Sequence, residues 1–293
     1  MDKLIRPENT LSVLRKHNRR LRKRFGQNFL VDEGVVRTIM DAADLQPDDC
    51  VVEVGPGIGT LTQFLAERAG QVVAVEIDRD LVAILSETLS GYDHVTVINQ
   101  DILKTDLAQI AQEYAHGRPL KVVANLPYYI TTPILTQLLS LKVPLTSITV
   151  MVQKEVAERM QAWPGSKAYG SLSLAVQYYA DVHLDTVVPP HCFIPHPKVE
   201  SAVITLTLPS SHPVTVADEE RMGGLIRAAF GQRRKTLANA LSGAPALQLS
   251  REEIQQALTR LGLPEDVRGE KLTLDDFAAL SDQLPQKTPS EDR

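Results

Sequence analysis

Three glycines and two acidic residues stand where a small ligand could bind. Gly55, Gly57 and Gly59 come at every second position after a short apolar run, and a helical pattern follows them. Glycines beyond a buried strand let the backbone turn sharply and let a ligand lie against it. Glu76 and Asp101 end two later apolar runs. Because ligands of open α/β sheets bind at the carboxyl ends of the strands, we expect one site that uses all five residues.

The chemistry of these groups indicates an adenosine-containing ligand. The Glu76 carboxylate can accept hydrogen bonds from both ribose hydroxyls, and Asp101 can accept one from the adenine amine. A dinucleotide loop needs glycine or alanine at its sixth position, where this chain has Thr60. The missing glycine disfavours a pyrophosphate, so S-adenosylmethionine fits better than a nicotinamide dinucleotide. Taken singly, each acid could also be an ordinary strand-end residue.

The motif Asn125-Leu126-Pro127-Tyr128 follows a fourth apolar run and supplies groups for chemistry on an amine. The adenine amine is a poor nucleophile because its lone pair is delocalised into the ring. The Asn125 side-chain oxygen and the Leu126 carbonyl could accept from this amine and aim its lone pair at a sulfonium methyl group. Pro127 fixes the chain direction, and the Tyr128 ring could hold an unstacked base. The alternative interpretation is a turn with a core tyrosine.

Alternating strand and helix patterns place these residues at one edge of a sheet. The pattern predicts a doubly wound, mostly parallel seven-stranded sheet, with the last two strands as an edge hairpin. The expected strands are Cys50–Val54, Val72–Ile77, Val95–Gln100, Lys121–Asn125, Ser147–Gln153, His183–Val188 and Ser201–Leu208. The expected helices are Glu33–Ala43 with Asp32 as its N-cap, Leu61–Ala69, Asp80–Leu89, Leu107–Tyr114, Pro133–Leu141, Glu155–Met160 and Ser171–Tyr179.

A proline-rich linker at residues 209–213 precedes a purely helical pattern. Its expected helices are Glu219–Phe230, Arg234–Leu241, Arg251–Leu261 and Asp275–Leu284. We therefore expect four regions: a basic arm at 1–24, an α/β domain at 25–208, a small all-helical domain at 209–285 and a disordered tail at 286–293.

Positive charge is concentrated in two places, although the formal net charge is −5. The first 24 residues carry nine Lys and Arg against two acids. A second cluster, Arg227 with Arg233-Arg234-Lys235, lies in a stretch without acids. Clustered cations displace counterions from a polyanion, so both clusters are candidate phosphate-binding surfaces. The alternatives are a solvated, partly disordered tail and a solvated helix start.

The remaining composition excludes several classes of protein. The two cysteines, Cys50 and Cys192, form no disulfide framework and fit a reducing cytoplasm. No apolar stretch is long enough to span a membrane. His191 and His196 flank Cys192, but prolines interrupt this region and no second ligand pair exists, so we expect no metal.

Six motifs, in the same order as in the family, resemble the small-subunit ribosomal RNA adenine dimethyltransferases. They are Phe25-Gly26-Gln27-Asn28-Phe29-Leu30, Glu53-Val54-Gly55-Pro56-Gly57-Ile58-Gly59, Asn125-Leu126-Pro127-Tyr128, Gln153-Lys154-Glu155-Val156-Ala157-Glu158-Arg159, Phe193-Ile194-Pro195-His196-Pro197-Lys198-Val199 and Phe230-Gly231-Gln232-Arg233-Arg234-Lys235-Thr236-Leu237. The resemblance runs from about residue 24 to residue 280. It implies a Rossmann-like S-adenosylmethionine-dependent methyltransferase domain followed by a small helical domain.

The resemblance also implies roles for individual residues. The expected cofactor contacts are Asn28, Leu30, Gly55, Gly57, Glu76, Asp101 and Asn125. Asn125, Leu126 and Tyr128 would surround the methyl-transfer point. Phe193 matches a second aromatic residue, expected on the opposite face of the target base from Tyr128; alternatively it is a core phenylalanine. The expected RNA contacts are Arg20, Arg22, Lys23, Arg24, Arg233, Arg234 and Lys235.

Three functional hypotheses follow. The first is dimethylation of N6 on two adjacent adenosines in the 3′-terminal hairpin loop of small-subunit (16S) ribosomal RNA. The partner would be this RNA in the assembling 30S subunit, bound by a cytoplasmic monomer. The second is an assembly factor whose checkpoint role matters more than methylation. The third is a nicotinamide-dependent oxidoreductase, which Thr60 and the Asn125–Tyr128 motif disfavour.

Overall fold

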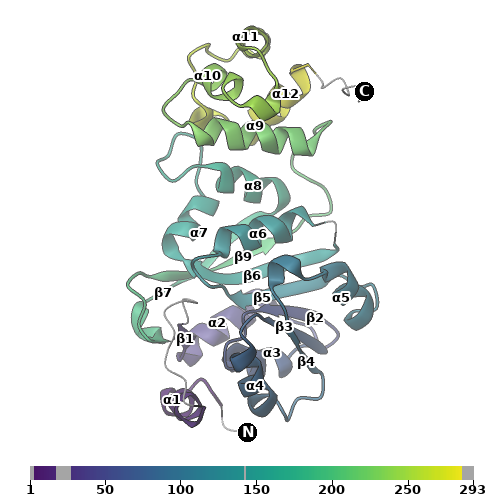
Figure 1. Ribbon diagram of the computed structural model, residues 1–293, viewed down its shortest axis with the longest axis vertical. Coiled ribbons are helices and arrows are strands. Elements are labelled where there is room, and N and C mark those ends of the chain that lie inside the picture. The colour runs from purple at the N-terminus through teal and green to yellow at the C-terminus, as the bar shows by residue number, and fades with distance from the viewer. Residues whose placement is uncertain (1–2, 18–27, 142, 286–293) are drawn as a thin grey trace. The chain divides into compact units, whose positions relative to one another are not determined.

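The computed structural model describes residues 3–17, 28–141 and 143–285, which divide into two compact units (Figure 1). Unit 1 contains the residues up to 157 together with 181–209. Unit 2 contains 158–180 and the residues from 210 onward. The arm residues 18–24 and the tail residues 286–293 lie outside the described part of the chain.

A seven-stranded sheet forms the centre of unit 1 within the described residues, in the order β4-β3-β2-β5-β6-β9-β7 (Figure 1). The strands are β2 Cys50–Val54, β3 Gln71–Glu76, β4 Val95–Asn99, β5 Leu120–Asn125, β6 Leu145–Gln153, β7 Asp181–Val188 and β9 Ser201–Thr207. The pairs among β4, β3, β2, β5 and β6 are parallel, and β9 pairs antiparallel with both β6 and β7. The prediction of a mostly parallel α/β sheet is therefore confirmed.

Burial explains why these strands read as continuous apolar runs. All five residues of β2 are buried, because parallel strands in the middle of a sheet are covered on both faces. The parallel register aligns Val54 with Val75 and Glu76 with Asn99. The carboxyl ends of β2, β3 and β5 consequently share one edge of the sheet.

Helices connect the parallel strands, and several begin at side-chain caps. Asp32 caps α2 by accepting a hydrogen bond from the Val35 amide at 3.0 Å. The helices of this part of the chain are α2 Glu33–Ala43, α3 Thr60–Ala66, α4 Arg79–Thr88, α5 Leu107–Tyr114, α6 Thr131–Ser140 and α7 Lys154–Met160. Two short strands, β1 Phe29–Leu30 and β8 Phe193–Ile194, pair separately.

The start of the basic arm is a helix, α1 Pro7–Lys16, packed on unit 1. The backbone amide of Leu4 donates to the side chain of Gln63 at 3.0 Å. Lys16 pairs with Glu87 at 2.5 Å. The interpretation of a solvated, partly disordered tail is therefore wrong for residues 3–17. Its physical reason is a set of buried apolar side chains among the cations: Leu4, Ile5 and Leu14.

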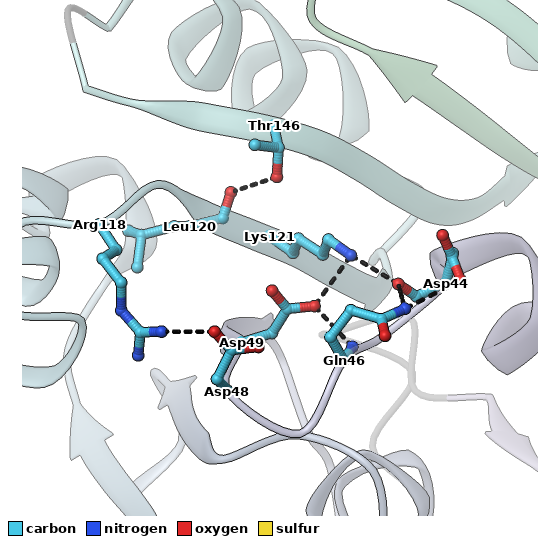
Figure 2. Close-up of polar contacts among 8 residues, drawn as sticks. All are labelled: Asp44, Gln46, Asp48, Asp49, Arg118, Leu120, Lys121 and Thr146. Carbon is cyan, nitrogen blue, oxygen red and sulfur yellow. Dashed lines mark hydrogen bonds and ion pairs between the residues drawn. The ribbon is translucent and has the colours of Figure 1, made fainter.

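A polar network joins the loop before β2 to the start of β5 (Figure 2). The Lys121 ammonium group donates to the backbone carbonyl of Asp44 at 2.6 Å and pairs with Asp49 at 2.8 Å. Arg118 pairs with Asp48 at 2.9 Å on the more exposed side of the network. Lys121 is only 15% exposed, so its ion pair is better shielded from solvent than that of Arg118. This network anchors the amino ends of the two central strands.

Unit 2 is helical in its described part. Its complete helices are α8 Ser171–Tyr179, α9 Glu219–Gly231, α10 Leu237–Ser242, α11 Arg251–Arg260 and α12 Leu274–Gln283. Tyr169, Leu174 and Phe277 are fully buried in one hydrophobic core. Residues 158–180 therefore belong with the helical unit, whereas the sequence pattern placed them with the sheet. Apolar side chains of α8 pack within the core that contains α9 and α12, which periodicity alone does not reveal.

The second basic cluster does not begin a helix. α9 ends at Gly231, and α10 begins at Leu237 with Thr236 as its N-cap. The expected helix start at Arg234 is thus wrong by three residues, because the Thr236 hydroxyl accepts the capping hydrogen bond from Asn239. Arg233, Arg234 and Lys235 lie on the exposed connection between the two helices.

Candidate functional site

A cavity that is open to solvent lies in unit 1 where the carboxyl ends of β2, β3 and β5 meet. Such clefts at strand ends are the usual ligand sites of doubly wound sheets. Its lining includes all seven residues that we expected to contact a cofactor: Asn28, Leu30, Gly55, Gly57, Glu76, Asp101 and Asn125. Leu126 and Tyr128 line it as well.

The glycine loop has a backbone that only glycine adopts without strain. Gly55, Gly57 and Gly59 have φ values of 67°, 63° and 94°, which are left-handed. A Cβ atom on Gly57 would lie 3.2 Å from the Phe29 ring. The loop therefore requires glycine both for its turn and for the close approach of β1.

Glu76 is held rigidly at the end of β3. Its carboxylate accepts hydrogen bonds from the Asp78 amide at 2.8 Å and from the Gly57 amide at 3.4 Å. It is 5% exposed, and this burial raises its pKa to about 7. The side chain thus sits between the glycine loop and the start of α4, with its orientation fixed by backbone donors.

Asp101 caps the short 3₁₀ helix Ile102–Lys104 by accepting from the Leu103 amide at 3.0 Å. Ile102 and Ile77 also line the cavity, each directly after one of the two acids. Ile77 is 51% exposed, which is unusual for a large apolar residue. Sequence reasoning missed both isoleucines, although an apolar residue directly after each strand-end acid was visible. They provide apolar contact surface beside the two carboxylates.

A third acid, Glu53, lies beneath the loop and was not among the expected site residues. It is 1% exposed, and burial raises its pKa to about 8. A hydrogen bond from the Thr62 hydroxyl to the Glu53 carboxyl opposes part of this rise. Among the described residues the buried hydroxyl of Thr60 has no hydrogen-bond partner. Buried polar atoms of this kind are normally satisfied by water or by a ligand. Glu53 and Thr60 both line the cavity.

Asn125 ends β5 with its side chain fixed by the first motif. Its Nδ2 atom donates to the backbone carbonyl of Asn28 at 3.2 Å. The Leu126 amide donates to the Met151 carbonyl at 3.1 Å, which sets the direction of the peptide that follows. The amide oxygen of Asn125 therefore remains to accept a hydrogen bond at the cavity.

Tyr128 lies half-buried at the cavity, and its hydroxyl is 2.6 Å from the Ser201 hydroxyl. Burial raises the pKa of this phenol, so it is neutral at physiological pH. Tyr129 also lines the cavity and is 58% exposed. The sequence analysis assigned base stacking to Tyr128 alone and missed Tyr129, although this second aromatic residue directly follows it in the sequence.

Phe193 is not brought to the cavity. It pairs with Leu30 across the β1–β8 ladder and is 0% exposed. Its ring packs in the hydrophobic cluster that includes Val36 and Ile39. The alternative interpretation, a core phenylalanine, is what this structure shows. The expected place of Phe193 on the second face of a target base stays a prediction, since the ring is buried in this structure beside the cavity-lining Leu30.

Only some of the expected RNA contacts lie in the part of the chain that the structure describes. Arg233 pairs with Glu270 at 3.2 Å and donates to the Lys167 carbonyl at 3.3 Å. Arg234 and Lys235 are exposed beside it. The other predicted contacts, Arg20, Arg22, Lys23 and Arg24, lie outside the described residues.

No helix in residues 3–17, 28–141 and 143–285 is long and apolar enough to cross a bilayer. In the same ranges no three His, Cys, Asp or Glu side chains are grouped so as to hold a metal ion.

The strand order, the glycine loop after β2 and the acid that ends β3 define the class of S-adenosylmethionine-dependent methyltransferases. Within that class, residues 18–286 match the family described as ribosomal RNA adenine dimethylase. The chain belongs to this family. Membership explains why an Asn-Leu-Pro-Tyr motif stands at the end of β5 beside the cofactor cavity.

Relatives of known name support this assignment. The chain is 55% identical to the ribosomal RNA small subunit methyltransferase A of Lachnoclostridium phytofermentans, over 96% of this chain and 97% of the relative. Identity to the protein of the same name from Clostridioides difficile is 46%, over 99% and 100%.

Two solved structures share the fold. A dimethyladenosine transferase from Plasmodium falciparum is similar with a TM-score of 0.69 and 26% identity, over 86% of this chain and 95% of that one. The 23S rRNA methyltransferase ErmE is similar with a TM-score of 0.65 and 27% identity, over 88% and 100%.

Proposed function

We propose that this protein transfers methyl groups from S-adenosylmethionine to N6 of two adjacent adenosines in the 3′-terminal hairpin loop of small-subunit (16S) ribosomal RNA. Each adenosine receives two methyl groups. The observation that carries the proposal is the Asn125–Asn28 hydrogen bond inside the cavity that also contains Glu76 and Asp101. The names of the relatives support the choice of small-subunit RNA.

The residues of the cavity fit S-adenosylmethionine. Glu76, with its carboxylate already oriented by backbone amides, would accept from the ribose hydroxyls, and Asp101 would accept from the adenine amine. Ile77 and Ile102 offer apolar surface to the adenine ring. When bound, this cofactor supplies an electrophilic methyl group on a sulfonium.

Orientation of the target amine is the task of the motif at the end of β5. The Asn125 oxygen and the Leu126 carbonyl accept from N6, which turns the lone pair of that nitrogen away from the two acceptors. Attack by N6 would form a carbon–nitrogen bond while the bond between the methyl carbon and sulfur breaks, with S-adenosylhomocysteine as the leaving group, and the methylated amine would then lose a proton to solvent. No strong general base is needed, because the positively charged amine is acidic.

A flipped target base would lie on Tyr128, whose hydroxyl is anchored by Ser201. The exposed ring of Tyr129 is available at the same opening of the cavity. Phe193 has no part in this account, since its ring is buried in the core. The residues proposed to stack on the base therefore stand in the same short segment as Asn125 and Leu126, just after Pro127.

RNA beyond the target base would be held by phosphate contacts. Arg233, Arg234 and Lys235 are positioned on the surface of unit 2, and the arm residues Arg20, Arg22, Lys23 and Arg24 are proposed for the same task. Such contacts position RNA without reading its sequence. We further propose that the protein acts as a monomer, in the cytoplasm, on the assembling 30S subunit and contributes to its biogenesis.

The proposal is tested with small ribosomal subunits that lack the methylation. Purified protein and S-adenosylmethionine carrying a labelled methyl group are added, and incorporation into RNA is counted. We expect four methyl groups per subunit, two on each adenosine. No incorporation, or incorporation into large-subunit RNA instead, contradicts the proposal. A matched reaction with fully methylated subunits measures the background.

A further inference from the structure

Trp163 is the only tryptophan of the chain, and it is 74% exposed. It is the most exposed large apolar side chain in the part of the chain that the structure describes. The others of this kind belong to unit 1: Ile77, Tyr129, Leu184, Val187 and Val199. Trp163 is therefore a single exposed ring in unit 2 rather than part of an apolar patch.

The loop that carries Trp163 is anchored in place. The Ser166 amide donates to the Trp163 carbonyl at 3.1 Å, and the Gly165 amide donates to the Glu270 carbonyl at 2.7 Å. The Tyr169 hydroxyl donates to the Leu272 carbonyl at 2.8 Å. Because the backbone after Pro164 is tied to a second segment at Gly165 and again at Tyr169, the ring is presented by a fixed support.

Cations surround this support. Arg233 donates to the Lys167 carbonyl at 3.3 Å, so the connection between α9 and α10 meets the tryptophan loop. The Lys271 ammonium group lies close to Gly165: it is 3.2 Å from the point where a Cβ atom would stand if residue 165 had a side chain. The segments 163–167, 232–236 and 268–271 together contain six cations and one acid: Lys167, Arg233, Arg234, Lys235, Arg268, Lys271 and the acid Glu270. The single acid is already paired with Arg233.

We propose that Trp163 and these cations form a second RNA site, in which an unpaired nucleotide stacks on the indole ring while the cations bind the phosphates beside it. This site rests on the proposed function, since it assumes that the partner is RNA. An exposed aromatic ring within a basic surface is the arrangement by which proteins hold single-stranded nucleic acid. A protein partner is disfavoured because the core of a protein interface is apolar and depleted of charge, whereas the segments that meet the Trp163 loop are rich in cations.

The test measures affinity for small ribosomal subunits that lack the methylation, at fixed salt, using full-length protein. Trp163→Ala and Trp163→Leu are expected to weaken binding about 5- to 100-fold, since base stacking on an aromatic ring contributes on this scale. Trp163→Phe retains a ring and is expected to bind within about threefold of the unchanged protein. Because Trp163 is 74% exposed, all three variants should fold; their melting temperature and S-adenosylmethionine affinity verify this.

The leucine variant separates stacking from simple apolar contact. Equal binding by Trp163→Leu and the unchanged protein overturns the inference, as does weak binding by Trp163→Phe. Repeating the titration with protein-free 16S RNA distinguishes RNA from ribosomal protein as the partner. A defect of Trp163→Ala that appears only with intact subunits assigns the ring to a protein contact and also overturns the inference.

The phosphate contacts have their own matched pair of variants. Lys271→Gln removes a cation beside the tryptophan loop. The slope of the logarithm of the binding constant against the logarithm of the salt concentration should become shallower by about one. Arg251→Gln removes an exposed cation at the start of α11, outside the three segments, and should leave the slope unchanged. Equal slopes for both variants contradict the site. Methyl transfer by the unchanged protein is measured in parallel, so failure of this site and failure of the proposed function give different results.

Discussion

The side-chain nitrogen of Asn125 lies 3.2 Å from the backbone carbonyl of Asn28 and donates a hydrogen bond to it. A carbonyl can only accept, so the contact fixes which end of the amide faces Asn28. The amide oxygen is left as an acceptor for a substrate amine. Two segments distant in sequence thus set the direction of one catalytic acceptor.

Replacing Asn125 by alanine removes this acceptor without filling the cavity. We expect the single-turnover rate of methyl transfer to fall about 100-fold or more, because misorientation of a reacting group has effects of this size. The dissociation constant for S-adenosylmethionine should change little, as measured by calorimetry. Full activity of Asn125→Ala would remove the proposed role of the amide.

The variant Asn125→Asp separates the acceptor from its orientation. Aspartate keeps an oxygen but cannot donate to the Asn28 carbonyl, and two acceptors would then face each other. We expect activity to be lost as severely as in the alanine variant. Retained transfer by Asn125→Asp would show that the hydrogen bond to Asn28 does not position the acceptor.

Two buried acids make the stability of the cofactor-free protein depend on pH. Burial raises the pKa of Glu76 to about 7 and that of Glu53 to about 8. Both pKa values lie above those of the same groups in the unfolded chain, so folding favours the neutral carboxyl groups. The stability that the two neutral groups contribute at low pH is lost as the pH rises through these folded-state pKa values. The free energy of unfolding by urea should fall between about pH 5 and pH 8, and Glu53→Gln should flatten this slope.

The same ionisation should couple to cofactor binding. Ribose hydroxyls donate to the ionised form of Glu76, so binding of S-adenosylmethionine should release a proton near pH 6 and tighten as the pH rises. Calorimetry in two buffers of different ionisation enthalpy measures the proton release. Glu76→Gln should bind more weakly and show a smaller release. An unchanged release in this variant would contradict the assignment of Glu76.

The glycine loop offers a prediction with a matched control. Gly57→Ala meets both a left-handed backbone (φ 63°) and the Phe29 ring at 3.2 Å. Gly117→Ala meets a similar φ of 80° but only a side-chain atom of Gln112 at 3.8 Å. Backbone strain alone costs about 1–2 kcal/mol, so Gly57→Ala should exceed that loss and also weaken S-adenosylmethionine binding. If the two variants behave alike, the close approach of β1 is unimportant.

Two substitutions in the network of Figure 2 should lower the free energy of unfolding by different amounts. Lys121→Met leaves Asp49, which is 21% exposed, without its ammonium partner. Arg118→Met breaks a pair that is 50% and 77% exposed. We expect about 1–3 kcal/mol of destabilisation for the first change and about 0–1 kcal/mol for the second. Denaturant unfolding of both variants measures the difference, and equal losses would contradict the shielding of the Lys121 pair.

Residues at strand ends could be located from the sequence because parallel strands align their carboxyl ends. Glu76, Asp101 and Asn125 each follow an apolar run, and the parallel pairing then brings them to one cavity. The glycine spacing identified the loop in the same way. These inferences needed the order of elements but no side-chain packing.

Contacts between distant segments could not be predicted in this way. The side chain of Phe193 turns into the core because β8 pairs with β1, and a motif does not specify which face of a strand is buried. The buried positions Leu4 and Leu14 are concealed among cations, so the pattern predicted a basic arm without a packed helix. Glu53 was passed over because an acid inside an apolar run gives no sign that the cavity reaches it.

Mass spectrometry of small-subunit RNA shows directly which nucleosides the protein methylates. Unmethylated small subunits are incubated with the protein and S-adenosylmethionine, and RNA fragments are then sequenced by mass. We expect two adjacent N6,N6-dimethyladenosines in the 3′-terminal hairpin loop, and their absence when Asn125→Ala is used. Methylation at any other nucleoside, or an unmodified hairpin loop, would contradict it.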